Sequence, residues 1–204
     1  ATVALDEPRR TSLLSRIPSG GDVLMVGAPV KEKATGIMFP QLCNGMNLVG
    51  TGVRIKWGLI KVYAVGTYMD PIAMGGVKNQ STQVLEKVLL NPLYPRTIRI
   101  VMNRALSIEK YTSAIVEALE PRMNGEDLEF LEEFKKLNPP VDLVEGAEIE
   151  MTIRGDTLLY RNAVGGVGAI HSAVFTRALC DVYYGKDPVS PTHKQAVLEG
   201  IPKM

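Results

Sequence analysis

Cysteine and histidine are both scarce in this chain, with two of each among 204 residues. Two cysteines cannot form the disulfide framework of a small secreted domain, so Cys43 and Cys180 suit a reducing compartment or plain burial. His171 and His193 have no cysteine or carboxylate neighbours at the spacing of metal ligands. We therefore expect neither a disulfide-stabilised scaffold nor a metal site, and no motif indicates a cofactor.

The chain also lacks an excess of charge and a long apolar run. Its 23 basic and 22 acidic residues leave a formal net charge of +1, which indicates neither nucleic acid nor an anionic membrane surface as a partner. No apolar run approaches the ~20 residues of a transmembrane helix. The hydrophobic share of 46% is typical of a globular protein, and the length suits one domain, or a domain with an extension.

Hydrolase and phosphate-binding motifs are missing or incomplete. There is no G-x-S-x-G elbow. Ser107 and Lys110 form an S-x-x-K pair without its companion motifs, and Ser107 is better explained as a helix N-cap. The glycines of 165–168 lack the G-x-G-x-x-G spacing and the βαβ setting of a dinucleotide-binding loop, so we predict a plain turn there.

The first residues of the chain form a separate region. Residues 1–21 show no periodicity, contain two prolines and end in Ser-Gly-Gly, which predicts an extended arm available to a protein partner. Residues 22–204 are expected to form one domain, beginning with a strand at 22–27. The first residue is Ala1, as after removal of a targeting peptide, although trimming of an expressed protein would look the same.

The stretch 50–71 organises the predicted fold. Val53, Ile55 and Trp57 alternate with Arg54 and Lys56, and a run rich in β-branched and aromatic residues follows Gly58. Arg54 precedes that run, so its guanidinium is expected at the mouth of whatever the sheet encloses. Arginine can bind a carboxylate or phenolate through two parallel hydrogen bonds. An exposed edge-strand arginine fits the same sequence pattern.

The remaining pattern predicts an α+β fold in which one antiparallel sheet is covered by helices on one face. Helices are expected at 80–90, 107–121, 128–137, 170–184 and 191–199, because apolar residues recur there at helical spacing. Strands are expected at 36–39, 50–57, 59–69, 96–103, 147–153 and 157–162. Asn44-Gly45 and Gly155-Asp156 predict hairpin turns.

One constellation can carry chemistry. Tyr63 lies in the central strand on the side of Val65 and Thr67, and Tyr111 lies on the apolar face of its helix. Two phenols and the Arg54 guanidinium around an apolar pocket can bind an oxyanion head with an apolar body behind it. Core tyrosines without a ligand explain the same pattern.

Four segments resemble the chalcone isomerase family, in particular its non-catalytic fatty-acid-binding branch. They are TGIMFP at 35–40, GTGVR with KVYAVGTYMD within 50–70, RALSIEKY at 104–111, and RALCDVYYGKDPVSPTHK at 177–194. The resemblance covers 35–194 in the right order. It implies an open-faced β-sandwich, with a large antiparallel sheet, a helical layer and a ligand cleft between them.

The resemblance also implies roles for single residues. In the true isomerases an arginine at the position of Arg54 stabilises the developing phenolate charge, helped by a helix tyrosine at the position of Tyr111. Their strand threonine corresponds to Tyr63, their helix asparagine to Ala118 and their late threonine or serine to Val182, so isomerase activity is not expected. In the fatty-acid-binding relatives an arginine and two tyrosines grip the carboxylate, which carries over to Arg54, Tyr63 and Tyr111.

The function expected from the resemblance is non-catalytic binding of a fatty acid or a similar amphipathic small molecule. Two alternatives stay open. One is a chalcone-type isomerase using Arg54 and Tyr111, and the other is an accessory or scaffold subunit of a larger assembly, to which the arm at 1–21 and the substituted pocket point. The fatty-acid-binding relatives are plastid proteins, so a plastid location is expected.

Overall fold

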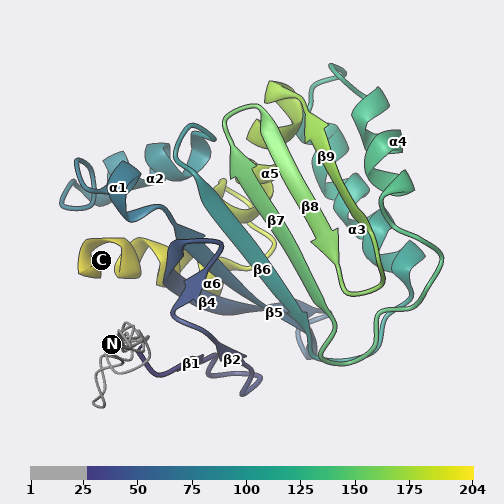
Figure 1. The fold of residues 1–204 in the computed structure, drawn as a ribbon, viewed down its shortest axis with the longest axis horizontal. Helices are drawn as coiled ribbons and strands as arrows, with labels where there is room; N and C mark the ends of the chain where they lie inside the picture. The colour runs from purple at the N-terminus through teal and green to yellow at the C-terminus, as the bar shows by residue number, and fades with distance from the viewer. Residues whose placement is uncertain (1–26) are drawn as a thin grey trace, which may run out of the picture.

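The computed structural model describes residues 27–204 (Figure 1). Its main feature is a seven-stranded sheet in which every strand runs antiparallel to its neighbours in sequence. The strands are β3 (Leu42–Cys43), β4 (Met46–Lys56), β5 (Ile60–Met69), β6 (Arg96–Met102), β7 (Glu148–Arg154), β8 (Thr157–Asn162) and β9 (Val167–His171). The predicted antiparallel sheet is confirmed.

Both turn signals found in the sequence join neighbouring strands. Asn44 and Gly45, with φ of 52° and 74°, join β3 to β4. Gly155, with φ of 60°, joins β7 to β8. A left-handed backbone at such positions matches the right-handed twist of the flanking strands and favours Asn and Gly.

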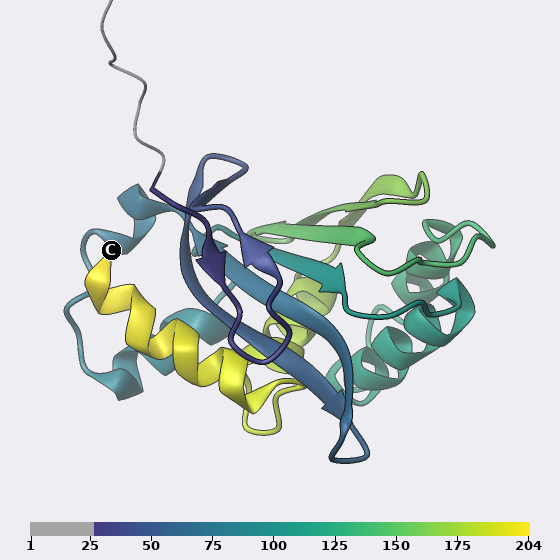
Figure 2. The ribbon, with the colours of Figure 1, turned by 90° about the horizontal axis from the view of Figure 1, so that it is seen from below.

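The helices cover one face of this sheet. They are α1 (Pro71–Met74), α2 (Thr82–Leu90), α3 (Ile108–Leu119), α4 (Glu129–Lys136), α5 (Ala173–Tyr184) and α6 (Pro191–Gly200), with short 3-10 turns at Glu120–Arg122 and Ile201–Lys203. The predicted apolar face of α3 is buried, and the Ser107 hydroxyl caps this helix by accepting a hydrogen bond from the Lys110 amide. Seen from below, the helices gather on one side of the twisted sheet (Figure 2).

The opposite face carries a small second sheet. Its strands are β1 (Val30–Lys31) and β2 (Met38–Phe39). The prediction that 36–39 joins the large sheet is therefore wrong. The reason is that Phe39 packs onto the face of the large sheet instead of joining its edge. It lies against Gly66, with the centre of its ring 5.5 Å from the Arg99 guanidinium, and Pro40 ends the strand directly after it.

A second correction concerns the edge strand β9. The sequence predicts a loop at 165–168 and a helix from 170, but residues 167–171 pair with β8 and α5 begins only at Ala173. Gly168 allows this, because a Cβ there would lie 2.4 Å from the Leu137 side chain. A glycine needed for close packing resembles a loop glycine in sequence.

Two further expectations concern the start of the chain and the membrane. The arm predicted over 1–21, and the strand predicted over 22–27 apart from its last residue, lie outside the described residues. Among residues 27–204, no helix is both long and apolar enough to span a bilayer.

Candidate functional site

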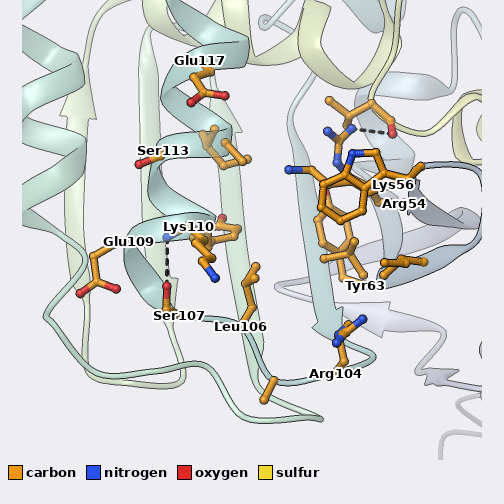
Figure 3. A pocket seen from close by; sticks show the side chains of 18 residues that line it. Arg54, Lys56, Tyr63, Arg104, Leu106, Ser107, Glu109, Lys110, Ser113 and Glu117 are labelled. Carbon is orange, nitrogen blue, oxygen red and sulfur yellow. Dashed lines mark hydrogen bonds between the residues drawn. The ribbon is translucent and has the colours of Figure 1, made fainter.

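A cavity of about 580 Å³ lies between α3 and the hairpin formed by β4 and β5. Figure 3 shows Arg54, Lys56 and Tyr63 on the strand side, facing the side chains of α3. Its apolar lining comes from both sides and includes Trp57, Ile60, Val62, Ala105, Leu106, Ala114 and Ile115. Arg54, Tyr63 and Tyr111 all line this one cavity. The structure thus brings together the three residues singled out in the sequence.

The β4–β5 register places Arg54 on the helix-covered face. Arg54 pairs directly with Tyr63, and two residues back along the strand Gly52 pairs with Val65. The Arg54 Nη1 donates a 2.8 Å hydrogen bond to the Val189 carbonyl. The turn at 188–191 that carries Val189 is itself held to β4, because the Ser190 hydroxyl donates to the Val53 carbonyl at 2.7 Å.

The Arg54 guanidinium has no acidic partner within residues 27–204. Its side chain is half-buried, and the Val189 carbonyl engages only one nitrogen of the fork. A partly desolvated cation with unengaged donors is suited to an anion that arrives from outside the chain.

The two predicted phenols are buried at this cavity, and Tyr63 lies within reach of the Arg54 charge. Burial raises the pKa of Tyr63 above its ordinary value, and the Arg54 charge opposes part of that rise. Burial also raises the pKa of Tyr111 well above its ordinary value, and the Tyr111 hydroxyl has no hydrogen-bond partner. Both groups therefore stay protonated and able to donate at neutral pH.

A third phenol, Tyr183 of α5, was not predicted. Its buried hydroxyl also lacks a hydrogen-bond partner, and burial raises its pKa while the nearby Arg54 charge lowers it in part. In sequence Tyr183 is one of several apolar residues of a helix, and only the packing of α5 under the sheet brings it towards Arg54. No local signal marks it.

The mouth of the cavity is more basic than the sequence suggested. Lys56, Arg104 and Lys110 line it, and none of them makes an ion pair in the described part of the chain. The acidic side chains Glu109 and Glu117 belong to α3, as does Lys110, and all three lie on the other side of the cavity from Arg54 (Figure 3).

Two of the positions compared with the polar groups of isomerases, Ala118 and Val182, contribute no polar atoms to the cavity. Val182 is fully buried and Ala118 packs against the core, and neither lines the cavity. No group of three metal-ligating side chains occurs within 27–204. His193 is buried and bonds the Thr67 hydroxyl through Nε2 at 2.8 Å, while its Nδ1 has no hydrogen-bond partner. His171 is exposed.

Comparisons with known proteins agree with the architecture. The crystal structure of the Arabidopsis thaliana fatty-acid binding protein AtFAP1 matches with a TM-score of 0.72 at 23% identity, over 86% of this chain and 98% of that one. A comparison with curated proteins gives no significant match. The model of a family described as chalcone isomerase-like matches residues 41–199, well over half of the chain. The chain therefore belongs to the chalcone isomerase-like family.

Proposed function

We propose that this protein binds a fatty acid without catalysis, with the carboxylate at Arg54 and the hydrocarbon tail in the cavity beside α3. The observation that carries the proposal is the half-buried Arg54 guanidinium, which has no acidic partner among the described residues and opens into an apolar cavity. A carboxylate supplies the missing anion, and the hydroxyls of Tyr63 and Tyr111 donate to its remaining lone pairs. The similarity of fold to a fatty-acid binding protein supports the same ligand class.

The size and lining of the cavity suit a hydrocarbon tail. A volume of about 580 Å³ lies within the ordinary range for small-molecule sites. Each buried methylene contributes about 0.8 kcal/mol, so selectivity for chain length follows from cavity depth. Tail burial needs no polar group, which agrees with the apolar side chains of Ile60, Val62 and Ile115 in the cavity lining.

The first test is a titration with a fluorescent long-chain fatty acid. We expect Arg54→Ala to weaken binding roughly 10- to 100-fold, because it leaves a desolvated carboxylate unpaired. Arg54→Lys should fall between this variant and the wild type, since an ammonium cannot reproduce the fork, and Tyr63→Phe should lose only a few-fold. Arg154→Ala is the matched control, because Arg154 is exposed and lies outside the cavity.

Wild-type affinity in Arg54→Ala would sink the proposal, provided that its thermal unfolding is unchanged. Mass spectrometry of a lipid extract from the purified protein separates a binder from a scaffold subunit. A chalcone cyclisation assay separates a binder from an isomerase, and we expect no turnover above the spontaneous rate. The plastid location implied by the resemblance belongs to this proposal and is tested by fluorescent tagging in plant cells.

A further inference from the structure

The hairpin between β4 and β5 exposes two large apolar side chains at its tip. Trp57 is 83% exposed and Leu59 is 87% exposed. Trp57 is the only tryptophan of the chain. Tryptophan is usually well buried in a protein of this size. An exposed tryptophan at the tip of a turn is therefore unusual, and exposed apolar groups of this kind often mark an interaction site.

The backbone at the tip makes this tryptophan costly. Trp57 and Gly58 both have left-handed backbones, with φ of 50° and 73°. Such a turn favours Asn or Gly at its first position, and a bulky side chain there is strained. A polar residue would satisfy both the turn and the solvent. An aromatic side chain held against both preferences is typical of a position with a function.

One basic group lies at the tip, and two more line the cavity next to it. The Lys56 ammonium lies 6.0 Å from the centre of the Trp57 ring. Lys56, Arg104 and Lys110 line the cavity together with Trp57, and no acidic side chain in 27–204 pairs with them. With Arg54 the lining has four basic residues against two acidic ones, Glu109 and Glu117. Apolar and cationic groups therefore share one end of the molecule, although the whole chain is nearly neutral.

We propose that the hairpin tip of residues 56–59 inserts into an anionic lipid surface and brings the cavity mouth to the headgroup region. Tryptophan prefers the interface between water and hydrocarbon, and leucine the acyl boundary below it. Each neighbouring cation strengthens binding to anionic lipid about fivefold. Two protruding side chains bury too little surface for a stable protein interface, which favours the bilayer over a protein partner.

The location of the tip gives the docking a use. Trp57 and Lys56 belong both to the tip and to the cavity lining, so a docked hairpin places the opening beside the bilayer, from which an amphipathic ligand can enter with little exposure to water. This use rests on the proposed function, whereas the docking itself does not.

The test uses the full chain and the fluorescence of its single tryptophan. Vesicles of phosphatidylglycerol and phosphatidylcholine, free of fatty acid, should shift the Trp57 emission to shorter wavelength and carry the protein down on sedimentation. Pure phosphatidylcholine vesicles should do neither, and 0.5 M NaCl should weaken the binding. Lack of both signals with anionic vesicles overturns the proposal.

Leu59→Ser is the decisive variant, because Leu59 does not line the cavity. It should reduce vesicle binding at least fivefold and leave the affinity for a fluorescent fatty acid in solution unchanged. The matched control is Ile72→Ser, since Ile72 is 90% exposed and lies beyond the opposite end of β5. Equal vesicle binding by Leu59→Ser and wild type would assign the binding to another surface and overturn the proposal.

Other outcomes are equally clear. A dimer that Leu59→Ser dissociates, without vesicle binding, would make the tip an interface between copies and overturn the lipid proposal. Vesicle binding in a protein that fails to bind fatty acid would uphold the docking and sink the proposed function instead.

Discussion

The Tyr111 hydroxyl is buried against the cavity without a hydrogen-bond partner. An orphaned buried hydroxyl destabilises a protein, because it loses its water contacts and gains nothing in return. The hydroxyl of Tyr183, which lies near Arg54, is likewise buried without a partner. In the proposed function, a carboxylate held at Arg54 is the acceptor that Tyr111 lacks.

Tyr111→Phe should therefore raise stability and lower affinity together. We expect the free energy of unfolding to rise by roughly 1 kcal/mol and fatty-acid affinity to fall several-fold. Thermal unfolding and titration measure the two effects. Tyr160→Phe is the matched control, because the Tyr160 hydroxyl donates to the Asn138 side chain at 2.7 Å and its loss should lower stability. A less stable Tyr111→Phe with unchanged affinity would contradict the assignment.

At the scale of single residues, the sequence contained part of the candidate site. Tyr111 stands on an apolar helix face, so local periodicity predicts where it points. The pattern around Arg54 fitted an exposed edge-strand arginine equally well, and only the β4–β5 register places it on the helix-covered face. Tyr183 and the basic mouth depend on the approach of elements distant in sequence. Trp57 was expected within a strand, but its positive φ makes it a turn residue, and only the hairpin geometry exposes it.

At the scale of elements, two glycines determine how α6 packs on β4. A Cβ at Gly52 would lie 2.5 Å from the His193 backbone, and one at Gly50 would lie 2.5 Å from the Val197 backbone. Gly52 lies two residues before Arg54 in β4, and α6 begins directly after the turn that binds Arg54. The close approach of strand and helix thus fixes the Val189 carbonyl that orients the guanidinium.

Gly52→Ala should consequently damage both stability and binding. The backbone of α6 cannot yield as a side chain can, so we expect a loss of roughly 1–3 kcal/mol in the free energy of unfolding. Fatty-acid affinity should fall as the turn at 188–191 shifts away from Arg54. Gly76→Ala is the control, because nothing lies within 4 Å of its Cβ position. Denaturant titration would refute this account if Gly52→Ala proved as stable as wild type.

Long periodic elements were predictable and short edge strands were not. The strands at 60–69 and 96–102 and the helix at 108–119 have complete periodic patterns, which tertiary packing reinforces. β9 and β2 are shorter, and each is stabilised by contacts with a neighbouring strand. β9 pairs with β8, and Phe39 of β2 packs against Gly66 of β5. Such strands depend on the partner surface, which local sequence does not contain.

At the scale of the whole molecule, total charge and local charge differ. A formal charge of +1 correctly describes the average, but it conceals the basic groups at the cavity mouth. The core likewise contains polar groups that the composition does not reveal. His193 lies within it, with ring centroids 6.2 Å from Tyr183 and 5.9 Å from Tyr184.

Burial lowers the pKa of His193 from its ordinary 6.5 to about 3. Because this folded-state pKa is depressed, the His193 imidazole binds a proton below pH 6.5 in the unfolded chain but stays neutral in the folded chain. The stability present above pH 6.5 is therefore lost as the pH falls towards 3, by about 1.4 kcal/mol for each pH unit. Acid should unfold the protein partly through this one residue.

His193→Gln should remove this part of the pH dependence. The glutamine amide does not titrate and can still bond the Thr67 hydroxyl, which now bonds the imidazole at 2.8 Å. Even if the variant is less stable at pH 7, its free energy of unfolding should fall less steeply between pH 6.5 and 4 than that of the wild type. The carboxylates titrate in both proteins, so their effect cancels in this comparison. His171→Gln, at an exposed position, should follow the wild type. Denaturant unfolding curves that stay parallel for His193→Gln and wild type across this range would show that His193 is protonated in the folded protein, and that its surroundings admit water or an acidic partner.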